Sequence, residues 1–229
     1  MEKARYLIFD AGPLINFAMN GILDILENLK KVFEGEFLIT KEVKYEIIDH
    51  PLLIKRFELE ALKLKDLFDR KIIKLASITP GQVNELRKIR NHLMDIANST
   101  FIAKGRYLHL LDKGECAVFA LASLLSTPYV VIDERTARLL CENPENLRKI
   151  LEKKLHSYVE AKKKNYKYFK DFKIIRSAEL VYYAYKKNLV KLKDPKLLEA
   201  LLYGVKYKGC SISREEIEEM KRINRIEKV

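Results

Sequence analysis

The sequence predicts an α/β fold, in which helices flank a central parallel sheet and a mostly helical C-terminal extension follows. Two short apolar runs, Tyr6–Phe9 and Tyr129–Ile132, have the length and residue types of buried strands. Segments of helical periodicity lie between them, and the Ala- and Leu-rich segment Asp112–Ser126 is the clearest. Strands that alternate with helices along a chain indicate a parallel sheet with helical crossovers.

Local signals predict the other elements in chain order. Gly12-Pro13 marks the turn into a first helix, because proline suits the first helical position. Thr40 is an N-cap for the helix that contains Glu46, and Thr79-Pro80 opens a later helix. Apolar spacing predicts the remaining elements of this region: a helix over Ile22–Val32, a strand at Phe37–Ile39, a long amphipathic helix over Pro51–Lys71, a strand at Ile72–Ile78 and a helix ending near Ala97.

The chain changes character after Asn143-Pro144, where we place a domain boundary. Residues 1–144 carry the alternating pattern and should form the α/β domain. Residues 145–229 should form a basic, mostly helical extension. Its predicted helices lie at about Ala178–Lys187, Pro195–Val205 and Ser213–Arg225, after a short apolar stretch at Ile174-Ile175.

Composition limits the class of protein. Of the 229 residues, 48% are hydrophobic and 33% are charged, which is typical of a globular chain. No apolar run reaches the ~18–20 residues of a membrane helix, and the chain does not open like a signal peptide, so we expect a cytoplasmic protein. The three cysteines lack the spacing of a zinc site.

The formal net charge of +12 favours a polyanionic partner, nucleic acid before an acidic membrane. The alternative is the Lys- and Glu-rich, Gln-poor composition of a thermophile, in which Gln82 is the only glutamine. Such an origin explains many ion pairs but not the excess of positive charge.

Four acidic positions, far apart in sequence, stand at strand ends or in early helix turns. Asp10 follows the first strand, Glu46 lies in the helix after the second, Glu115 begins the Ala-rich helix, and Asp133, with Glu134 beside it, ends the VVID strand. Ligands of parallel sheets bind beyond the carboxyl ends of the strands. Clustered carboxylates repel one another unless a hard divalent cation neutralises them. The pattern therefore predicts metal-assisted phosphodiester chemistry.

Two of these acids also have a purely structural interpretation as caps. Asp10 is suited to an Asx-turn or N-cap before the first helix, and Asp133 to the N-cap of a helix over Glu134–Cys141. Asn16 is interpreted as a solvated side chain, with contact to substrate or water as the alternative.

The other two acids have similar alternatives. Asp112 and Glu115 have the spacing of a capping box, in which Glu115 only satisfies a backbone donor. Glu46 has the alternative of a solvated helix glutamate, and Glu42 competes for its role. The joint occurrence of all four acids favours a site.

The segments FDAGPLINF, KEVKYEII, DKGECAVFALA and YVVIDERTAR occur in this order up to about residue 143. Together they resemble the acidic motifs of the PIN domain, the nuclease fold of VapC-type toxins and several RNA-processing enzymes. SAELVYYAYKKNLV and LLEALLYGVKYKGCSISREEIE are similar to the tail of an archaeal and bacterial PIN subgroup. Two departures are Ala11-Gly12, where many members have a hydroxyl residue, and Glu115, where VapC-type proteins commonly have Asp.

The resemblance implies a PIN-like three-layer fold and hydrolysis of RNA phosphodiester bonds. One or two Mg²⁺ or Mn²⁺ ions would be held by Asp10, Glu46, Glu115 and Asp133, with Glu134 as an alternative or additional ligand. It further implies a toxin-like or RNA-processing role, an antitoxin or other protein as partner, and pairing into a homodimer.

Residues 148–173, here called the basic segment, contain ten Lys or Arg and three acids, interleaved with aromatics. Basic side chains neutralise phosphates, and aromatic rings stack on unpaired bases. The alternative is a solvated helix face whose aromatics lie in the core. The predicted contacts to RNA are Lys162, Lys163, Lys164, Tyr166, Lys167 and Phe169.

The basic segment also supports a rival function, a non-catalytic RNA-binding module on the same fold. Other chemistries lack their motifs. The chain contains no G-x-x-x-x-G-K-S/T or G-x-G-x-x-G loop for a nucleotide, and no G-x-S-x-G elbow of a serine hydrolase.

Overall fold

The computed structural model describes residues 6–226 and confirms the predicted α/β class, with a central sheet flanked by helices. Five parallel strands form this sheet within the described residues, in the order β3-β2-β1-β6-β8. A smaller antiparallel sheet has the order β5-β4-β7. The strands are β1 (Tyr6–Phe9), β2 (Glu36–Ile39), β3 (Ile73–Leu75), β4 (Phe101–Ala103), β5 (Arg106–Tyr107), β6 (Tyr129–Val131), β7 (Val159–Ala161) and β8 (Lys173–Ile175).

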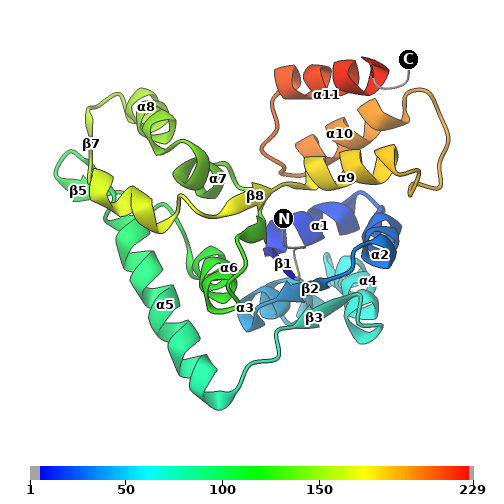
Figure 1. The fold of residues 1–229 in the computed structure, drawn as a ribbon, viewed down its shortest axis with the longest axis horizontal. Coiled ribbons are helices and arrows are strands. Elements are labelled where there is room, and N and C mark those ends of the chain that lie inside the picture. Colours follow the sequence, from blue (N-terminus) through cyan, green and yellow to red (C-terminus); the bar gives the residue numbers. More distant parts are fainter. Residues whose placement is uncertain (1–5, 227–229) are drawn as a thin grey trace.

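Helices connect the strands and form the layers on either side of the sheet (Figure 1). Short helical turns complete them, namely the π-helical η1 (Tyr45–Asp49) and the 3-10 helices η2 (Pro51–Leu53) and η3 (Lys163–Tyr168). The α-helices are α1 (Ala11–Met19), α2 (Leu23–Val32), α3 (Lys41–Lys44), α4 (Glu58–Asp69), α5 (Pro80–Asn98), α6 (Lys113–Leu124), α7 (Arg135–Glu142), α8 (Pro144–Leu155), α9 (Ser177–Lys186), α10 (Leu197–Tyr207) and α11 (Arg214–Ile226).

The order of the strands reverses beside β1. The chain runs from β1 outward through β2 to β3, and then returns to place β6 on the other side of β1. In the register of these neighbours, Ile8 lies beside Val130 and Phe9 beside Val131, and all four side chains are fully buried. Buried central strands are expected when helices cover both faces of a parallel sheet. The crevice beyond the carboxyl ends of β1 and β6 is therefore the topological switch point, where ligands of such sheets bind.

Helices from distant parts of the chain meet around this point. α6 packs on β1 and β6, and α5 packs along α6. On the other side, α1 contacts α4 and α9. Figure 1 shows α9, α10 and α11 grouped beside α1, whereas α5, α8 and the small sheet lie at the opposite end of the molecule.

The predicted helix over Pro51–Lys71 is wrong in its first third. The helix that Thr40 caps continues through the π turn of η1, and only η2 follows before the chain leaves helical geometry at Ile54. α4 begins at Glu58. Pro51 has no backbone N–H to donate and sits at the start of η2, so it separates two helices instead of beginning a long one. The next strand is also shorter than predicted, at Ile73–Leu75.

The C-terminal extension contains the predicted helices, and it also contributes two strands. β8 pairs in parallel with β6, so that Ile174 lies beside Val130. β7 pairs with β4 in the small sheet. Each sheet therefore contains strands from both sides of Pro144, where the sequence predicted a domain boundary. Among the described helices, none combines the length and the apolar character that crossing a membrane requires.

Candidate carboxylate site

The predicted acidic residues line one cavity of about 280 Å³, here called the carboxylate cavity. It lies beyond the carboxyl ends of β1 and β6, at the topological switch point of the sheet. The structure thus brings together all five acids that the sequence singled out, and it adds Asp112. The residues that line the cavity are Asp10, Gly12, Glu46, Asp112, Glu115, Asp133, Glu134, Lys208 and Gly209.

Asp10 comes directly after β1 and is the N-cap of α1. Its own backbone N–H donates to Val131 O at 2.9 Å, and its carboxylate accepts a long hydrogen bond of 3.5 Å from Gly12 N. Burial, together with the neighbouring carboxylates of Glu46 and Asp112, raises the pKa of Asp10 to about 7. The capping interpretation therefore holds, and backbone hydrogen bonds from Ala11 and Gly12 only partly offset the rise in pKa of this partly buried carboxylate.

Glu46 reaches the cavity from a π-helical turn. In η1 the backbone N–H of His50 donates to Tyr45 O at 2.9 Å, five residues back, and the buried Ile47 and Ile48 anchor the turn in the core. Such π turns inside helices are frequent at functional sites. Burial and the Asp112 carboxylate raise the pKa of Glu46. Its competitor Glu42 lies elsewhere, in an ion pair with Arg90 at 2.6 Å.

Asp112 and Glu115 form the predicted capping box at the start of α6. Glu115 N donates to Asp112 Oδ1 at 3.0 Å, and Asp112 N donates to Glu115 Oε2 at 2.9 Å. Burial raises the pKa of Glu115 to about 8, and the carboxylates of Asp112, Asp10 and Glu134 contribute to this. The capping box uses one oxygen of each carboxylate, so each keeps an oxygen for a ligand in the cavity.

Asp133 is the best satisfied carboxylate of the cavity. Its Oδ1 accepts from Ser177 N at 2.7 Å, and its Oδ2 accepts from Ser177 Oγ at 2.6 Å and from Asn16 Nδ2 at 3.0 Å. These three bonds fill most of the roughly four acceptor positions of a carboxylate. Asp133 does not cap the following helix, because Glu134 is the N-cap of α7 and accepts from Ala137 N at 2.7 Å.

Asn16 was predicted to be solvated, and this is wrong. It is fully buried, and its amide group donates to Asp133 and, at 2.8 Å, to Val205 O of α10. Asn16 therefore ties α1 to the C-terminal extension beneath the cavity.

The chemistry of the donor set fits a hard divalent cation, since every candidate ligand is a carboxylate oxygen. The pKa values of Asp10, Glu46 and Glu115 are raised because these carboxylates are buried close to other carboxylates. A bound cation would offset their negative charge. Within residues 6–226, however, no three Asp, Glu, His or Cys side chains are already placed to share one ion. An ion held by three or more of these carboxylates would therefore require at least one side chain to change its rotamer.

The basic segment does not form a single charged face. Phe169 is fully buried against Phe119, with ring centroids 5.8 Å apart, so the prediction that it stacks on RNA bases is wrong. The hydroxyl of Tyr166 donates to Glu145 at 3.2 Å, and its ring packs near Phe101. These aromatic side chains fill the space between α5, α6 and the extension, which the sequence pattern alone does not reveal.

The predicted lysines differ in their surroundings. Lys162 donates to the Tyr107 hydroxyl at 2.8 Å, and Lys163 pairs with Glu145 at 3.4 Å. Lys164 is exposed and forms no ion pair with a described residue, while the exposed Lys167 lies over the Tyr168 ring, 5.0 Å from its centroid. Only part of the predicted set is thus free to contact a phosphate.

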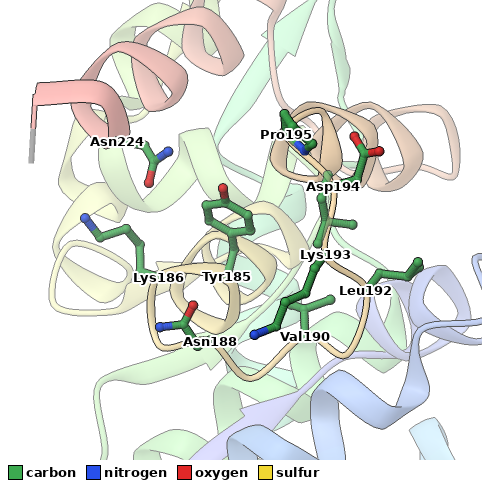
Figure 2. A pocket seen from close by; sticks show the side chains of 10 residues that line it. Tyr185, Lys186, Asn188, Val190, Leu192, Lys193, Asp194, Pro195 and Asn224 are labelled. Atoms are coloured by element: carbon green, nitrogen blue, oxygen red, sulfur yellow. The ribbon is translucent and has the colours of Figure 1, made fainter. Parts of the chain in front are cut away.

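A second cavity, of about 650 Å³, lies in the C-terminal extension beside α9 and the loop that follows it (Figure 2). Tyr185, Lys186, Asn188 and Asn224 surround it in this view. It contains none of the predicted site residues. A third cavity, of about 420 Å³, is mainly apolar, lies between α1 and α4, and shares Glu46 with the carboxylate cavity.

In comparisons with known proteins, no family model matches this chain and no curated protein matches it. The site therefore rests on its own geometry. Several residues of the cavity were missed by sequence reasoning. Asp112 was interpreted only as a cap, and Lys208 was given no role because nothing near it in the sequence places it at the cavity. Ser177, which bonds the cavity residue Asp133, was missed because that contact is tertiary.

Proposed function

We propose that this protein is a divalent-metal-dependent endoribonuclease that hydrolyses RNA phosphodiester bonds. The observation that carries the proposal is the convergence of six carboxylates, from separate segments of the chain, on one cavity at the switch point of a parallel sheet. Structural carboxylates are normally paired with a base or fully hydrogen-bonded, and a strongly raised pKa in a cleft is a mark of a functional site.

Each residue has a role in this proposal. Asp10, Asp112 and Glu115 would hold Mg²⁺ or Mn²⁺ through the oxygens that their caps leave free, and Glu46 would join them from η1. Glu134, which is exposed and keeps one oxygen outside its cap bond, would accept the proton of the attacking water. Asp133 would act as a positioning residue, since its hydrogen bonds join α1 and α9 to the floor of the cavity. When bound, a divalent ion supplies Lewis-acid activation of water and offsets charge on the phosphate.

RNA as the substrate is supported by two features. The chain has a net charge of +12, which favours a polyanion, and exposed lysines such as Lys164 and Lys167 lie in the basic segment. The resemblance of the four acidic segments to PIN-domain motifs adds the expectation of RNA over other polyanions.

The test is cleavage of a mixed pool of single-stranded RNA in the presence of Mn²⁺ or Mg²⁺. We expect cleavage by the wild type and a loss of at least about 100-fold in Asp10→Asn and Glu46→Gln, since even indirect partners of metal sites contribute 10- to 100-fold. Glu42→Gln is the matched control, because Glu42 lies four residues from Glu46 but pairs with Arg90 outside the cavity. No cleavage by the wild type with either ion would reject the proposal.

The second candidate function is a non-catalytic RNA-binding module. It is favoured by one observation, that no three side chains of residues 6–226 are already placed to share an ion. This function predicts RNA binding that is indifferent to divalent ions and to Asp10→Asn. The cleavage assay and an ion titration distinguish the two functions.

A protein partner, either an antitoxin or a second copy of the chain, is supported by an exposed apolar surface. Leu53, Phe57 and Met19 are 82%, 41% and 46% exposed, and the last two line the apolar cavity beside Glu46. Exposed apolar clusters of this kind mark interaction surfaces. Light scattering of the purified chain tests the homodimer directly, and Phe57→Ser should reduce the mass if this surface joins two copies.

A further inference from the structure

Lys208 holds a distinctive place at the carboxylate cavity. It follows α10 directly and lines the cavity together with Gly209. Among the described residues that line the cavity, it is the one basic side chain, and it stands against six carboxylates. It comes from the C-terminal extension, whereas all six acids come from the first 134 residues.

The backbone around Lys208 is fixed against the site. Cys210 N donates to Val205 O at 3.0 Å, and Ser211 N donates to Asp133 O at 3.0 Å. Between them, Gly209 adopts a φ of +118°, which side-chain-bearing residues rarely adopt. The turn that carries Lys208 is thus held beside Asp133 by hydrogen bonds on its C-terminal side.

The side chain of Lys208 is not used by the fold. It is exposed, and within the described part of the chain its ammonium group forms no ion pair and no hydrogen bond. Its neighbour Lys206 differs, because its ammonium group donates to Ile212 O and closes the same turn. A lysine with three free donors at the edge of a catalytic cavity is available to a phosphate.

An acidic cavity repels the strand that it must bind, because both are negatively charged. A cation at the rim offsets this repulsion for a phosphate next to the one that is cleaved. We infer that Lys208 binds the phosphate backbone of the substrate strand beside the carboxylate cavity, so that the C-terminal extension supplies a substrate contact of the site. The inference rests on the proposed function for the nature of the substrate.

The experiment compares the wild type with Lys208→Ala, Lys208→Arg and Lys193→Ala, all as the full chain. Lys193 is the matched control, because it is an exposed lysine of the same extension that lines the other cavity (Figure 2). The affinity for a labelled single-stranded RNA is measured in EDTA over a series of KCl concentrations. Cleavage of the same RNA is measured separately with Mn²⁺.

We expect Lys208→Ala to weaken binding by about threefold at low salt, as for an exposed charge pair. It should also flatten the plot of log K against log[salt] by about 0.7, the value for one phosphate contact of a single strand. Lys208→Arg should restore both values, and Lys193→Ala should match the wild type.

The inference and the proposed function fail in different ways. If Lys208→Ala keeps the affinity and salt slope of the wild type, the inference is overturned, whether or not the wild type cleaves. If the wild type does not cleave but Lys208→Ala changes the slope as expected, the nuclease proposal falls and the phosphate contact stands. A loss of affinity that Lys208→Arg does not restore would also overturn the inference, because a phosphate contact needs only the charge.

Discussion

The carboxylate cavity and the basic segment carry opposite charges, and they differ in how those charges are satisfied. In the cavity, burial and mutual repulsion raise the pKa of Asp10 and Glu115, and no described Lys or Arg pairs with either. In the basic segment, Arg148 pairs with both Glu145 and Glu152, at 3.1 and 2.6 Å. Charges that the fold has already paired are structural, whereas charges that it leaves unpaired in a cleft indicate a ligand.

The largest expected effect tests the structural side of this comparison. Phe169→Ala should lower the free energy of unfolding by about 3–5 kcal/mol, because it leaves a cavity beside Phe119 in the core. Tyr168→Ala, one residue earlier and 38% exposed, should lower it by only about 1 kcal/mol. Urea denaturation measures both values. If the variants were equally stable, the burial of Phe169 would not contribute as described.

The next largest effect concerns how far the buried, ionised Asp10 carboxylate lowers the free energy of unfolding. Folding raises the pKa of Asp10 from 3.8 to about 7, so the folded state resists losing this proton and is destabilised as the pH rises between these values. At 1.36 kcal/mol per unit of pKa, the penalty above pH 7 is at most about 4 kcal/mol. Asp10→Asn should therefore be more stable than the wild type at pH 8, by about 1–4 kcal/mol.

The same two proteins provide the control for this pH dependence. At pH 4 the Asp10 carboxyl of the folded wild type is protonated, so the advantage of Asp10→Asn should disappear. Denaturation of both proteins at pH 4 and pH 8 in EDTA measures the difference. An equal stability difference at the two pH values would show that Asp10 is not electrostatically strained.

A somewhat smaller effect tests whether a cation relieves this strain. At a free Mn²⁺ concentration about 100 times the dissociation constant, the free energy of unfolding of the wild type should rise by about 2.7 kcal/mol. Asp10→Asn should lose most of this gain, while Glu42→Gln should keep it, since Glu42 lies outside the cavity. Thermal melts with and without the ion measure the effect. An identical shift in all three proteins would place the ion elsewhere.

The smallest effect separates the lysines of the basic segment from one another. Lys164→Ala and Lys167→Ala should each flatten the salt dependence of RNA binding by about 0.7, if each contacts one phosphate. Lys163→Ala should change it less, because Lys163 already pairs with Glu145. Fluorescence anisotropy over a KCl series measures the slopes. Three unchanged slopes would show that the basic segment is only a solvated face.

The sequence predicted the parts of the fold that depend on local signals. The buried run at Tyr6–Phe9 and the capping box at Asp112 have their full cause within a few residues, and both occur in the structure. The break at Pro51 was missed because apolar spacing continued through it, although proline removes a backbone donor. The strands β7 and β8 were missed because each contains an exposed charged residue, Glu160 or Lys173, and so lacks the continuous apolar run of β1 and β6.

In the candidate site, too, some residues were predictable from local sequence and others depend on tertiary contacts. The acids at strand ends were identified because position along a parallel sheet determines where they meet. Asn16 looked like a surface residue because nothing nearby in sequence accepts its amide protons, and its partners Asp133 and Val205 lie 117 and 189 residues away. Likewise, nothing near Lys208 in the sequence places it at the cavity. Contacts of this separation are a property of the complete fold.

The hydrogen bonds between Asp133 and Ser177 have a consequence for how the protein is made. A ribosome that has synthesised the chain only to residue 172 has supplied all six carboxylates, but neither β8, which covers the edge of β6, nor the two donors of Ser177. An open strand edge and a buried carboxylate that lacks its partners both disfavour the folded state. The order of translation therefore delays completion of the site until β8 and Ser177 have emerged, and a chain truncated before them lacks the finished cavity.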